Sequence, residues 1–414
     1  MTNPGQHPCP IPGTNRLAAT VAFTLVFVAA QFAQAQTFNV LHSFNGLDGE
    51  HPYAGVTLDR GGNLYGTTYG GGSGAGTVYK LTHQSSGWTL NSLSTFAGGG
   101  SAPYAGVIFG PNGTLYGTTS KTGVHGGNGT VFNLSPSPTV CKTSLCPWTE
   151  TLLYVFAGPP DDGYGPGLGD LTFDQAGNIY GTTYAGGNSY GIVYELKPSG
   201  GAWTESVLHA FAYTDGAYPY SRVIFDNAGN LYGTTWGGGA QGAGTVFELT
   251  YSAGSGWTDT VLYSFQTASD GGNPYAGLIF DSSGNLYGAT STGGSGGGGT
   301  VFKLTPSNNG TWTYSLVYSF TGAADCGPQN SLVMDEAGNL YGTTYCHGAN
   351  NIGNVFKLTP SGNSWTYTSL HDFTGGSDGE IPFCSVAFDT SGNLYGTTVS
   401  GGSQDVGTVW EITP

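Results

Sequence analysis

Residues 62–68 read Gly-Asn-Leu-Tyr-Gly-Thr-Thr, and the same phrase recurs along the chain with single-residue variations. Its tyrosine stands at positions 65, 116, 180, 232, 287, 341 and 395, so consecutive copies are 51, 64, 52, 55, 54 and 54 residues apart. Seven units of this length account for residues 37–414. A fixed period of this size is typical of proteins in which each repeat is one supersecondary unit. The sequence therefore predicts a single domain built from seven similar units.

Each unit contains four short runs with the composition of β-strands. In the fifth unit the first run covers residues 275–280 and is followed by Asp-Ser-Ser-Gly-Asn, a sequence that forms tight turns. The second and third runs cover residues 286–290 and 300–304, and residues 257–265, which precede this unit, typify the fourth. Runs of β-branched and aromatic residues bounded by Gly, Asn, Asp and Ser predict strands. We expect one antiparallel four-stranded sheet per unit.

The two ends of the repeat array indicate how it closes. Residues 38–44 resemble the fourth run of a unit, and residues 408–412 resemble the third. An N-terminal strand that completes the last unit closes the array into a ring, whereas an open β-solenoid leaves ends that need capping. The sequence thus predicts an all-β, seven-bladed β-propeller of four-stranded antiparallel blades.

The composition excludes several classes of protein. Of the 414 residues, 74 are glycine, which disfavours a mainly helical fold. The chain is 13% aromatic and only 8% charged, the opposite of a disordered chain. A net charge of -16 gives no electrostatic support for binding nucleic acid or an anionic membrane. Glycine-rich runs such as residues 293–299 lack the lysine of a phosphate loop, and no cofactor or metal is expected.

The first 35 residues have the pattern of a secretory signal peptide. Arg16 precedes an apolar run from residue 17 to residue 32, and Ala33-Gln34-Ala35 offers small residues for cleavage. A transmembrane anchor is the alternative, but this run is short for a bilayer. We expect residues 36–414 to form the mature domain, a monomer that is secreted or otherwise extracytoplasmic, in the periplasm or at the cell surface.

The units resemble those of the Gloeo/Verruco (GloVer) tandem-repeat family, which combine Gly-Asn-Leu-Tyr-Gly-Thr-Thr with Gly-Thr-Val-Phe-Lys-Leu. Residues 229–235 and 244–249 show both elements. The resemblance implies an exported bacterial repeat protein, often of the choice-of-anchor type with a C-terminal sorting anchor, but this chain ends without a hydrophobic tail. It implies no catalytic residues. The run Asp-x-x-Gly-Asn-Leu-Tyr is more loosely similar to NHL-type propellers.

Five cysteines follow the expected signal peptide. Cys141 and Cys146 lie in the extra length of the 64-residue interval, so a local bridge between them is expected. Cys326 and Cys346 flank a hairpin that places them nearly opposite each other, which favours a second bridge. Pairing of Cys346 with Cys384 is the competing arrangement.

The recurring polar residues have structural interpretations. The aspartate that opens the first hairpin of six units could ligate calcium, but one carboxylate per unit is better explained as a turn former. The glycine of Tyr-Gly-Thr-Thr is expected to let adjacent blades approach near the axis. One fourth-strand position carries either His or Tyr, which favours a strand role over metal ligation or base catalysis: His42, His209 and His371, against Tyr154, Tyr263 and Tyr318.

A binding surface is predicted where two kinds of loop emerge on one face. The loop from the fourth strand into the next unit carries Asp in six units, and the loop from the second to the third strand opens with Tyr or Trp in four. Carboxylates beside flat aromatic faces suit a sugar, although turn formation and packing between blades are the alternative explanation. The expected residues are Asp162, Tyr184, Asp215 and Trp236 on units three and four, with Asp325 and Tyr345 beyond them.

Three classes of function remain. The low charge, abundant Tyr and Trp, and polar loops favour an exported, noncatalytic binding or scaffold protein with an extracellular glycan or surface partner. A polysaccharide hydrolase or lyase would need paired carboxylates or an acid and a base in one pocket. A purely structural component of the cell envelope would need no small ligand.

Overall fold

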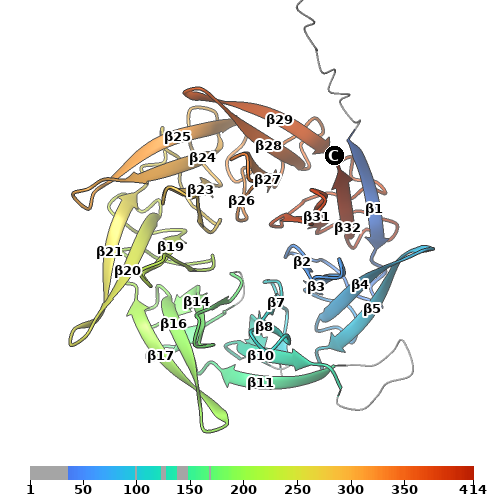
Figure 1. Ribbon diagram of the computed structural model, residues 1–414, viewed down its shortest axis with the longest axis horizontal. Coiled ribbons are helices and arrows are strands. Elements are labelled where there is room, and N and C mark those ends of the chain that lie inside the picture. The colour runs from blue at the N-terminus through green and yellow to red at the C-terminus, as the bar shows by residue number, and fades with distance from the viewer. Residues whose placement is uncertain (1–35, 98–99, 123–126, 138–147, 167–168) are drawn as a thin grey trace, which may run out of the picture. The chain divides into compact units, whose positions relative to one another are not determined.

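A computed structural model of the chain describes residues 36–97, 100–122, 127–137, 148–166 and 169–414. The expected signal peptide and the Cys141 and Cys146 pair lie outside these residues. Residues 36–414 form one compact unit. Its described secondary structure is all β, and seven four-stranded antiparallel sheets form the blades of a propeller (Figure 1). None of the described segments is a helix with the length and hydrophobicity that crossing a bilayer requires.

The strands of blades 1 to 6 follow one another in chain order from the axis outward. Blade 1 consists of β2 (Thr57–Leu58), β3 (Leu64–Thr68), β4 (Thr77–Gln84) and β5 (Gly87–Thr95). Blade 2 consists of β7 (Ile108–Phe109), β8 (Leu115–Thr119), β10 (Thr130–Ser135) and β11 (Thr149–Val155). Blade 3 consists of β13 (Thr172–Phe173), β14 (Ile179–Thr183), β16 (Ile192–Ser199) and β17 (Ala202–Ala210).

Blade 4 consists of β18 (Ile224–Phe225), β19 (Leu231–Thr235), β20 (Thr245–Ser252) and β21 (Gly256–Ser264). Blade 5 consists of β22 (Ile279–Phe280), β23 (Leu286–Thr290), β24 (Gly297–Pro306) and β25 (Trp312–Thr321). Blade 6 consists of β26 (Val333–Met334), β27 (Leu340–Thr344), β28 (Asn354–Ser361) and β29 (Ser364–Asp372).

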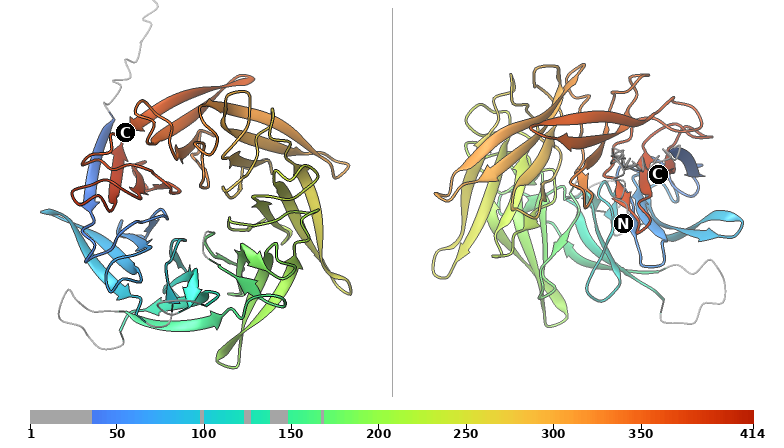
Figure 2. Two further views of the ribbon diagram at one scale, coloured as in Figure 1. Left: turned by 180° about the vertical axis from the view of Figure 1, so that it is seen from behind. Right: turned by 45° about the horizontal axis from the view of Figure 1, so that its top comes forward.

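Blade 7 combines the two ends of the described chain. Its inner strands are β30 (Ala387–Phe388), β31 (Leu394–Thr398) and β32 (Thr408–Thr413), and its outer strand is β1 (Thr37–Ser43). Strands β1 and β32 are antiparallel, with Thr37 opposite Thr413 and Ser43 opposite Thr408. Both views of Figure 2 show the two strands side by side. The predicted closure of the ring by the N-terminal strand is confirmed.

The aspartate at the first hairpin of a blade organises that turn. In blade 1, Oδ1 of Asp59 accepts hydrogen bonds from the backbone N–H groups of Gly61 (2.8 Å) and Asn63 (2.9 Å). Its Oδ2 accepts from Asn63 Nδ2 at 2.7 Å and from the Tyr65 hydroxyl at 3.0 Å. Partial burial acts to raise the pKa of Asp59, but these bonds hold it below its ordinary value. The aspartate is therefore satisfied within the hairpin, as expected of a turn former.

The two threonines of the repeated phrase have different partners. The first joins neighbouring blades, since the Thr67 hydroxyl donates to the carbonyl of Ala105 in the next unit at 2.8 Å. The same bond from Thr397 to Ala54, also 2.8 Å, links blade 7 to blade 1. The second threonine, such as Thr68, bonds a third-strand threonine of its own blade. In blade 1 both hydroxyls are buried and satisfied, so the phrase stabilises the sheet and the ring together there.

The glycine of the phrase has a different role from the one expected. A Cβ atom on Gly117 would lie 2.7 Å from Cζ of Phe132, which stands opposite it on the third strand of the same blade. Gly288 is placed in the same way against Phe302. The absent side chain therefore makes room for an aromatic ring within the blade. The expectation that it serves the approach of adjacent blades was wrong.

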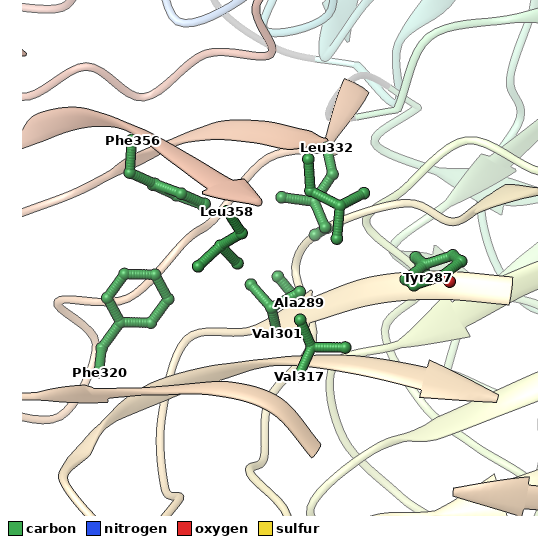
Figure 3. Packing of buried hydrophobic residues seen from close by; sticks show 10 residues of the cluster. Tyr287, Ala289, Val301, Val317, Phe320, Leu332, Phe356 and Leu358 are labelled. Carbon is green, nitrogen blue, oxygen red and sulfur yellow. The ribbon is translucent and has the colours of Figure 1, made fainter. Parts of the chain in front are cut away.

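Apolar cores lie between consecutive blades. Figure 3 shows the one between blades 5 and 6, where Val301 and Phe320 of blade 5 meet Phe356 and Leu358 of blade 6. The rings of Phe320 and Phe356 are 5.2 Å apart and nearly edge to face. Because both faces of a blade are covered in this way, the second strands are buried along their whole length.

Two loops of each unit pair with each other on one face of the ring. The loop that enters a unit meets the loop between its second and third strands, through β6 (Gly100–Ser101) with β9 (Lys121–Thr122) and β12 (Gly163–Tyr164) with β15 (Ala185–Gly186). Isolated bridges such as Glu50 with Gly70 make the same connection elsewhere. In blade 6 a disulfide joins Cys326 to Cys346 at this position, and Cys384 is a buried free thiol. The structure thus has the favoured pairing and not the pairing of Cys346 with Cys384.

Candidate binding site at the axis of the ring

In five units the segment that enters the first strand places an aromatic side chain near the axis. Proline followed by an aromatic residue occurs at this point in five units, and the aromatic residues are Tyr53, Tyr104, Tyr220, Tyr275 and Phe383. Proline fixes its φ angle and restricts the residue before it, so the segment approaches the axis in the same way each time. All five aromatic side chains are half-buried. They line hollows near the centre of the propeller.

Aromatic residues of the loops between second and third strands, together with Tyr164 of the loop that enters unit 3, join these five. We call the whole group the axial aromatic cluster, and it consists of Tyr53, Tyr69, Tyr104, Tyr164, Tyr184, Tyr220, Trp236, Tyr275, Tyr345 and Phe383. Tyr220 and Tyr275 are stacked, with ring centroids 5.0 Å apart. Phe383 lies 5.8 Å from Tyr53 and 6.5 Å from Tyr275, so the rings form a continuous chain across the axis.

Two hollows adjoin the cluster. A cavity of about 400 Å³ is lined by Tyr69, Tyr104, Ser120, Lys121, Tyr164, Gly165, Tyr184, Tyr220, Tyr275 and Phe383. A narrower cavity of about 30 Å³ is lined by residues of all seven units and shares Tyr104, Tyr275 and Phe383 with the first. Asp170 and Arg222 also line the narrow cavity, and Nε of Arg222 is buried without a hydrogen-bond partner. The larger cavity has the size and aromatic lining of a small-molecule site.

Five tyrosines of the cluster have raised pKa values and are neutral phenols at physiological pH: Tyr53, Tyr104, Tyr184, Tyr220 and Tyr275. Burial raises the pKa of Tyr184 to about 12, helped by its hydrogen bond with Tyr164. Burial and the neighbouring Tyr275 raise the pKa of Tyr220 to about 12. A neutral phenol can both donate and accept a hydrogen bond while its ring face stays available for stacking. The cavity wall is therefore polar at the hydroxyls and apolar at the rings.

The structure brings four of the six predicted site residues to this cluster. Tyr184, Trp236 and Tyr345 are members of it. Asp325 is exposed, accepts a hydrogen bond from Ser291 at 3.2 Å, and lies close enough to Tyr275 for its charge to raise the pKa of that phenol further, beyond the effect of burial.

The other two predicted residues, Asp162 and Asp215, have their carboxylates engaged at the junctions between outer strands. Oδ2 of Asp162 accepts hydrogen bonds from the Tyr154 hydroxyl (3.0 Å) and the backbone N–H of Ala157 (2.6 Å), and the residue is only 7% exposed. Asp215 is bonded to His209 Nε2 at 3.1 Å and to the backbone of Ala212 at 2.8 Å. These two carboxylates fix the loops that carry the aromatic residues.

Sequence reasoning missed the five aromatic residues that follow proline. The signal was visible, because Pro-Tyr recurs at residues 52–53, 103–104, 219–220 and 274–275. The sequence of a single unit does not show where this position lies in the ring. In the closed ring of seven units, the position faces the common axis. Residues that recur along the sequence are therefore close together at the axis.

The match to a family model extends over nearly the whole chain. Residues 28–146, 138–269 and 253–414 match the Gloeobacter/Verrucomicrobia repeat. The chain belongs to this family. No curated protein matches the sequence of this family member.

Several solved structures share the fold of this repeat protein. PorZ, a surface component of the type-IX secretion system of Porphyromonas gingivalis, is 17% identical with a TM-score of 0.50, over 89% of this chain and 47% of PorZ. The chain thus spans about half the length of PorZ. An ulvan lyase, from a new family of polysaccharide lyases, is 12% identical with a TM-score of 0.52, over 89% of this chain and 94% of the lyase. At these identities the likeness concerns the fold alone.

Proposed function

We propose that this repeat protein is an exported, noncatalytic binding module that holds carbohydrate against the axial aromatic cluster. The observation that carries the proposal is a cavity of about 400 Å³ lined mainly by half-buried tyrosines, of which Tyr184 and Tyr220 have raised pKa values and stay neutral. Pyranose rings stack their C–H faces on aromatic rings, and their hydroxyl groups bond phenols and backbone groups. Asp325 adds an exposed carboxylate acceptor beside Tyr275.

Export is part of the same proposal. The disulfide between Cys326 and Cys346 fits an oxidising compartment, where such bonds persist. PorZ, a protein of this fold, is described as a bacterial surface component, so the fold is compatible with a location outside the cytoplasm. Cleavage after Ala35 would give a mature N-terminus at Gln36, which mass spectrometry of the secreted protein identifies. An intact Met1 in a membrane fraction would contradict it.

The test is a glycan-binding screen, followed by calorimetry on the best ligand with single variants. Tyr220→Ala removes one ring of the stacked pair and is expected to weaken binding by about 1–2 kcal/mol, roughly tenfold. Tyr251→Ala is the matched control, because Tyr251 is 62% exposed on β20 and is not a member of the cluster. Equal affinity of both variants and the unaltered protein would place the site elsewhere.

The same screen separates this proposal from the other two functions. Release of shortened or unsaturated sugar products during incubation would identify a hydrolase or lyase. No binding to any glycan would favour a structural role in the envelope.

A further inference from the structure

The outer strands of consecutive blades meet at one recurring contact. At this contact, a side chain on the fourth strand of one blade faces a side chain on the fourth strand of the next blade. In several units the first of these side chains is also hydrogen-bonded to the aspartate of the loop that follows its strand. At three junctions two stacked rings fill this contact, and the pairs are Tyr263 with Tyr314, Tyr318 with Tyr367, and His371 with Phe38. Ring stacking is therefore one recurring arrangement at these positions, and Glu150 and Glu205 occupy the corresponding register position in blades 2 and 3.

The junction between blades 3 and 4 has a different composition. His209 of β17, Asp215 of the connecting loop and Asp259 of β21 bring one imidazole nitrogen and two carboxylate oxygens within 4.8 Å of one another. His209 Nε2 lies 3.1 Å from Asp215 Oδ2, and the other oxygen of Asp215 is held by the backbone of Ala212 at 2.8 Å. Two of the three groups are thus already oriented by the chain.

Asp259 supplies the observation that points to a ligand. Its Oδ1 is shielded from solvent and has no hydrogen-bond partner, although it is a strong acceptor. Within the described part of the chain, neither Asp215 nor Asp259 has a lysine or arginine partner. A buried, unpaired carboxylate oxygen beside a second carboxylate is costly unless a cation or a proton neutralises it.

We propose that His209, Asp215 and Asp259 bind a divalent transition-metal ion, of which Zn²⁺ fits best, and that the ion joins blade 3 to blade 4. One imidazole and two carboxylates are zinc ligands, whereas calcium and magnesium prefer oxygen alone. Ligand atoms about 2.0–2.2 Å from a tetrahedral zinc ion are roughly 3.4 Å apart. The spacing of 3.1 Å between His209 Nε2 and Asp215 Oδ2 is close to that value. Water would complete the fourth position.

Two other junctions of the same chain provide natural comparisons. His42 with Asp48 and His371 with Asp378 repeat the histidine and aspartate pair at 3.0 and 3.1 Å. At the first junction the residue in the register position of Asp259 is Leu90. At the second junction the residue in that position is Phe38. Both junctions therefore lack the third ligand, and only the junction with Asp259 is expected to bind the ion.

The experiment is calorimetric titration of Zn²⁺ into the purified protein after treatment with EDTA and dialysis. One site per chain is expected, together with a higher melting temperature when Zn²⁺ is present. Asp259→Asn keeps the shape of the side chain and should weaken binding at least about tenfold. Glu205→Gln is the matched control, because Glu205 occupies the corresponding register position in blade 3, and it should leave the affinity unchanged.

A gain of binding provides a second arm. Leu90→Asp adds the missing carboxylate opposite His42 and Asp48, and the stoichiometry should rise from one to two. If this variant fails to fold, the comparison of Asp259→Asn with Glu205→Gln still decides. Absence of Zn²⁺ binding, or equal binding by Asp259→Asn, would overturn the proposal.

Discussion

Each hairpin aspartate uses both carboxylate oxygens within six residues of itself. In blade 5, Asp281 accepts hydrogen bonds from the backbone of Ser283 and Asn285, from the Asn285 amide, and from the Tyr287 hydroxyl. Partial burial acts to raise the pKa of Asp281, but these bonds and nearby Lys303 lower it. The hairpin therefore stabilises the charged form of the Asp281 carboxylate.

We expect Asp281→Ala to destabilise the protein by about 1–3 kcal/mol, because several donors lose a charged acceptor. Urea denaturation followed by tryptophan fluorescence measures the change. Ser282→Ala, at an exposed position of the same turn, serves as the control and should be within about 0.5 kcal/mol of the unaltered protein. Equal stability of the two variants would mean that the turn forms without the carboxylate.

Glu205 gives the protein a predictable dependence on pH. Burial raises the pKa of Glu205 from 4.5 to about 7, and the charge of Asp162 adds to the effect. Tyr154 and Tyr194 also face it, and both remain protonated because burial and neighbouring acids raise their pKa values. Because the pKa of Glu205 is higher in the folded state than in the unfolded state, protonated Glu205 favours the folded state. Its contribution to the free energy of unfolding is complete below pH 4.5 and is lost as the pH rises through about 7.

Glu205→Gln cannot ionise and should remove this loss. The melting temperature of the variant is expected to exceed that of the unaltered protein at pH 8, with a smaller difference at pH 5. Exposed Glu336→Gln controls for the removal of one negative charge from a protein of net charge -16. A gain that is the same at both pH values would rule out ionisation of Glu205 as its cause.

Among the secondary-structure elements, the paired loops are reinforced differently in blade 6. Other units join the two loops by short β-bridges, whereas Cys326 and Cys346 join them covalently with a sequence separation of 20. A crosslink over this length restricts the unfolded chain and stabilises the folded state by roughly 3 kcal/mol in the chain-entropy model. The disulfide thus secures the loop that carries Tyr345 to the axial aromatic cluster.

A reducing agent should therefore lower the melting temperature of the unaltered protein. The double variant Cys326→Ser with Cys346→Ser should melt at the lower temperature whether or not the reducing agent is present. Cys384→Ala is the control, since that thiol is free, although its burial makes a small loss of stability expected. A double variant that still responds to reduction would show that another disulfide dominates.

For the whole molecule, closure depends on strand β1. Its pairing with β32 and the stacking of Phe38 on His371, 3.6 Å between ring centroids, join the start of the described chain to blades 6 and 7. Without this strand the edge of β32 would be free to pair with other chains. Deletion of residues 37–43 should lower the melting temperature and promote aggregation, as measured by calorimetry and light scattering.

A chain that begins at Gln36 and retains β1 is the control for that deletion. Thr37→Pro makes a milder perturbation at the strand end and should have a smaller effect. An unchanged melting temperature after loss of residues 37–43 would indicate that the closing strand contributes little to the stability of the ring.

The sequence by itself determined the repeat, the four strands per unit and the closing strand. These features depend on local turn chemistry and on a period that can be counted, and Asp59 with Asn63 shows how a hairpin is encoded within five residues. The disulfide between Cys326 and Cys346 could also be anticipated, because both cysteines flank one hairpin.

Only the tertiary structure decided which side chains of different units meet. Tyr220 and Tyr275 are 55 residues apart in sequence, and stack because seven blades turn the same position toward one axis. The carboxylate of Asp162, expected on the binding face, instead bonds Tyr154 of the preceding strand. His209 looks like any other strand histidine until Asp259 of the next blade is placed beside it. Contacts between units depend on the curvature of the closed ring, and no single unit contains that information.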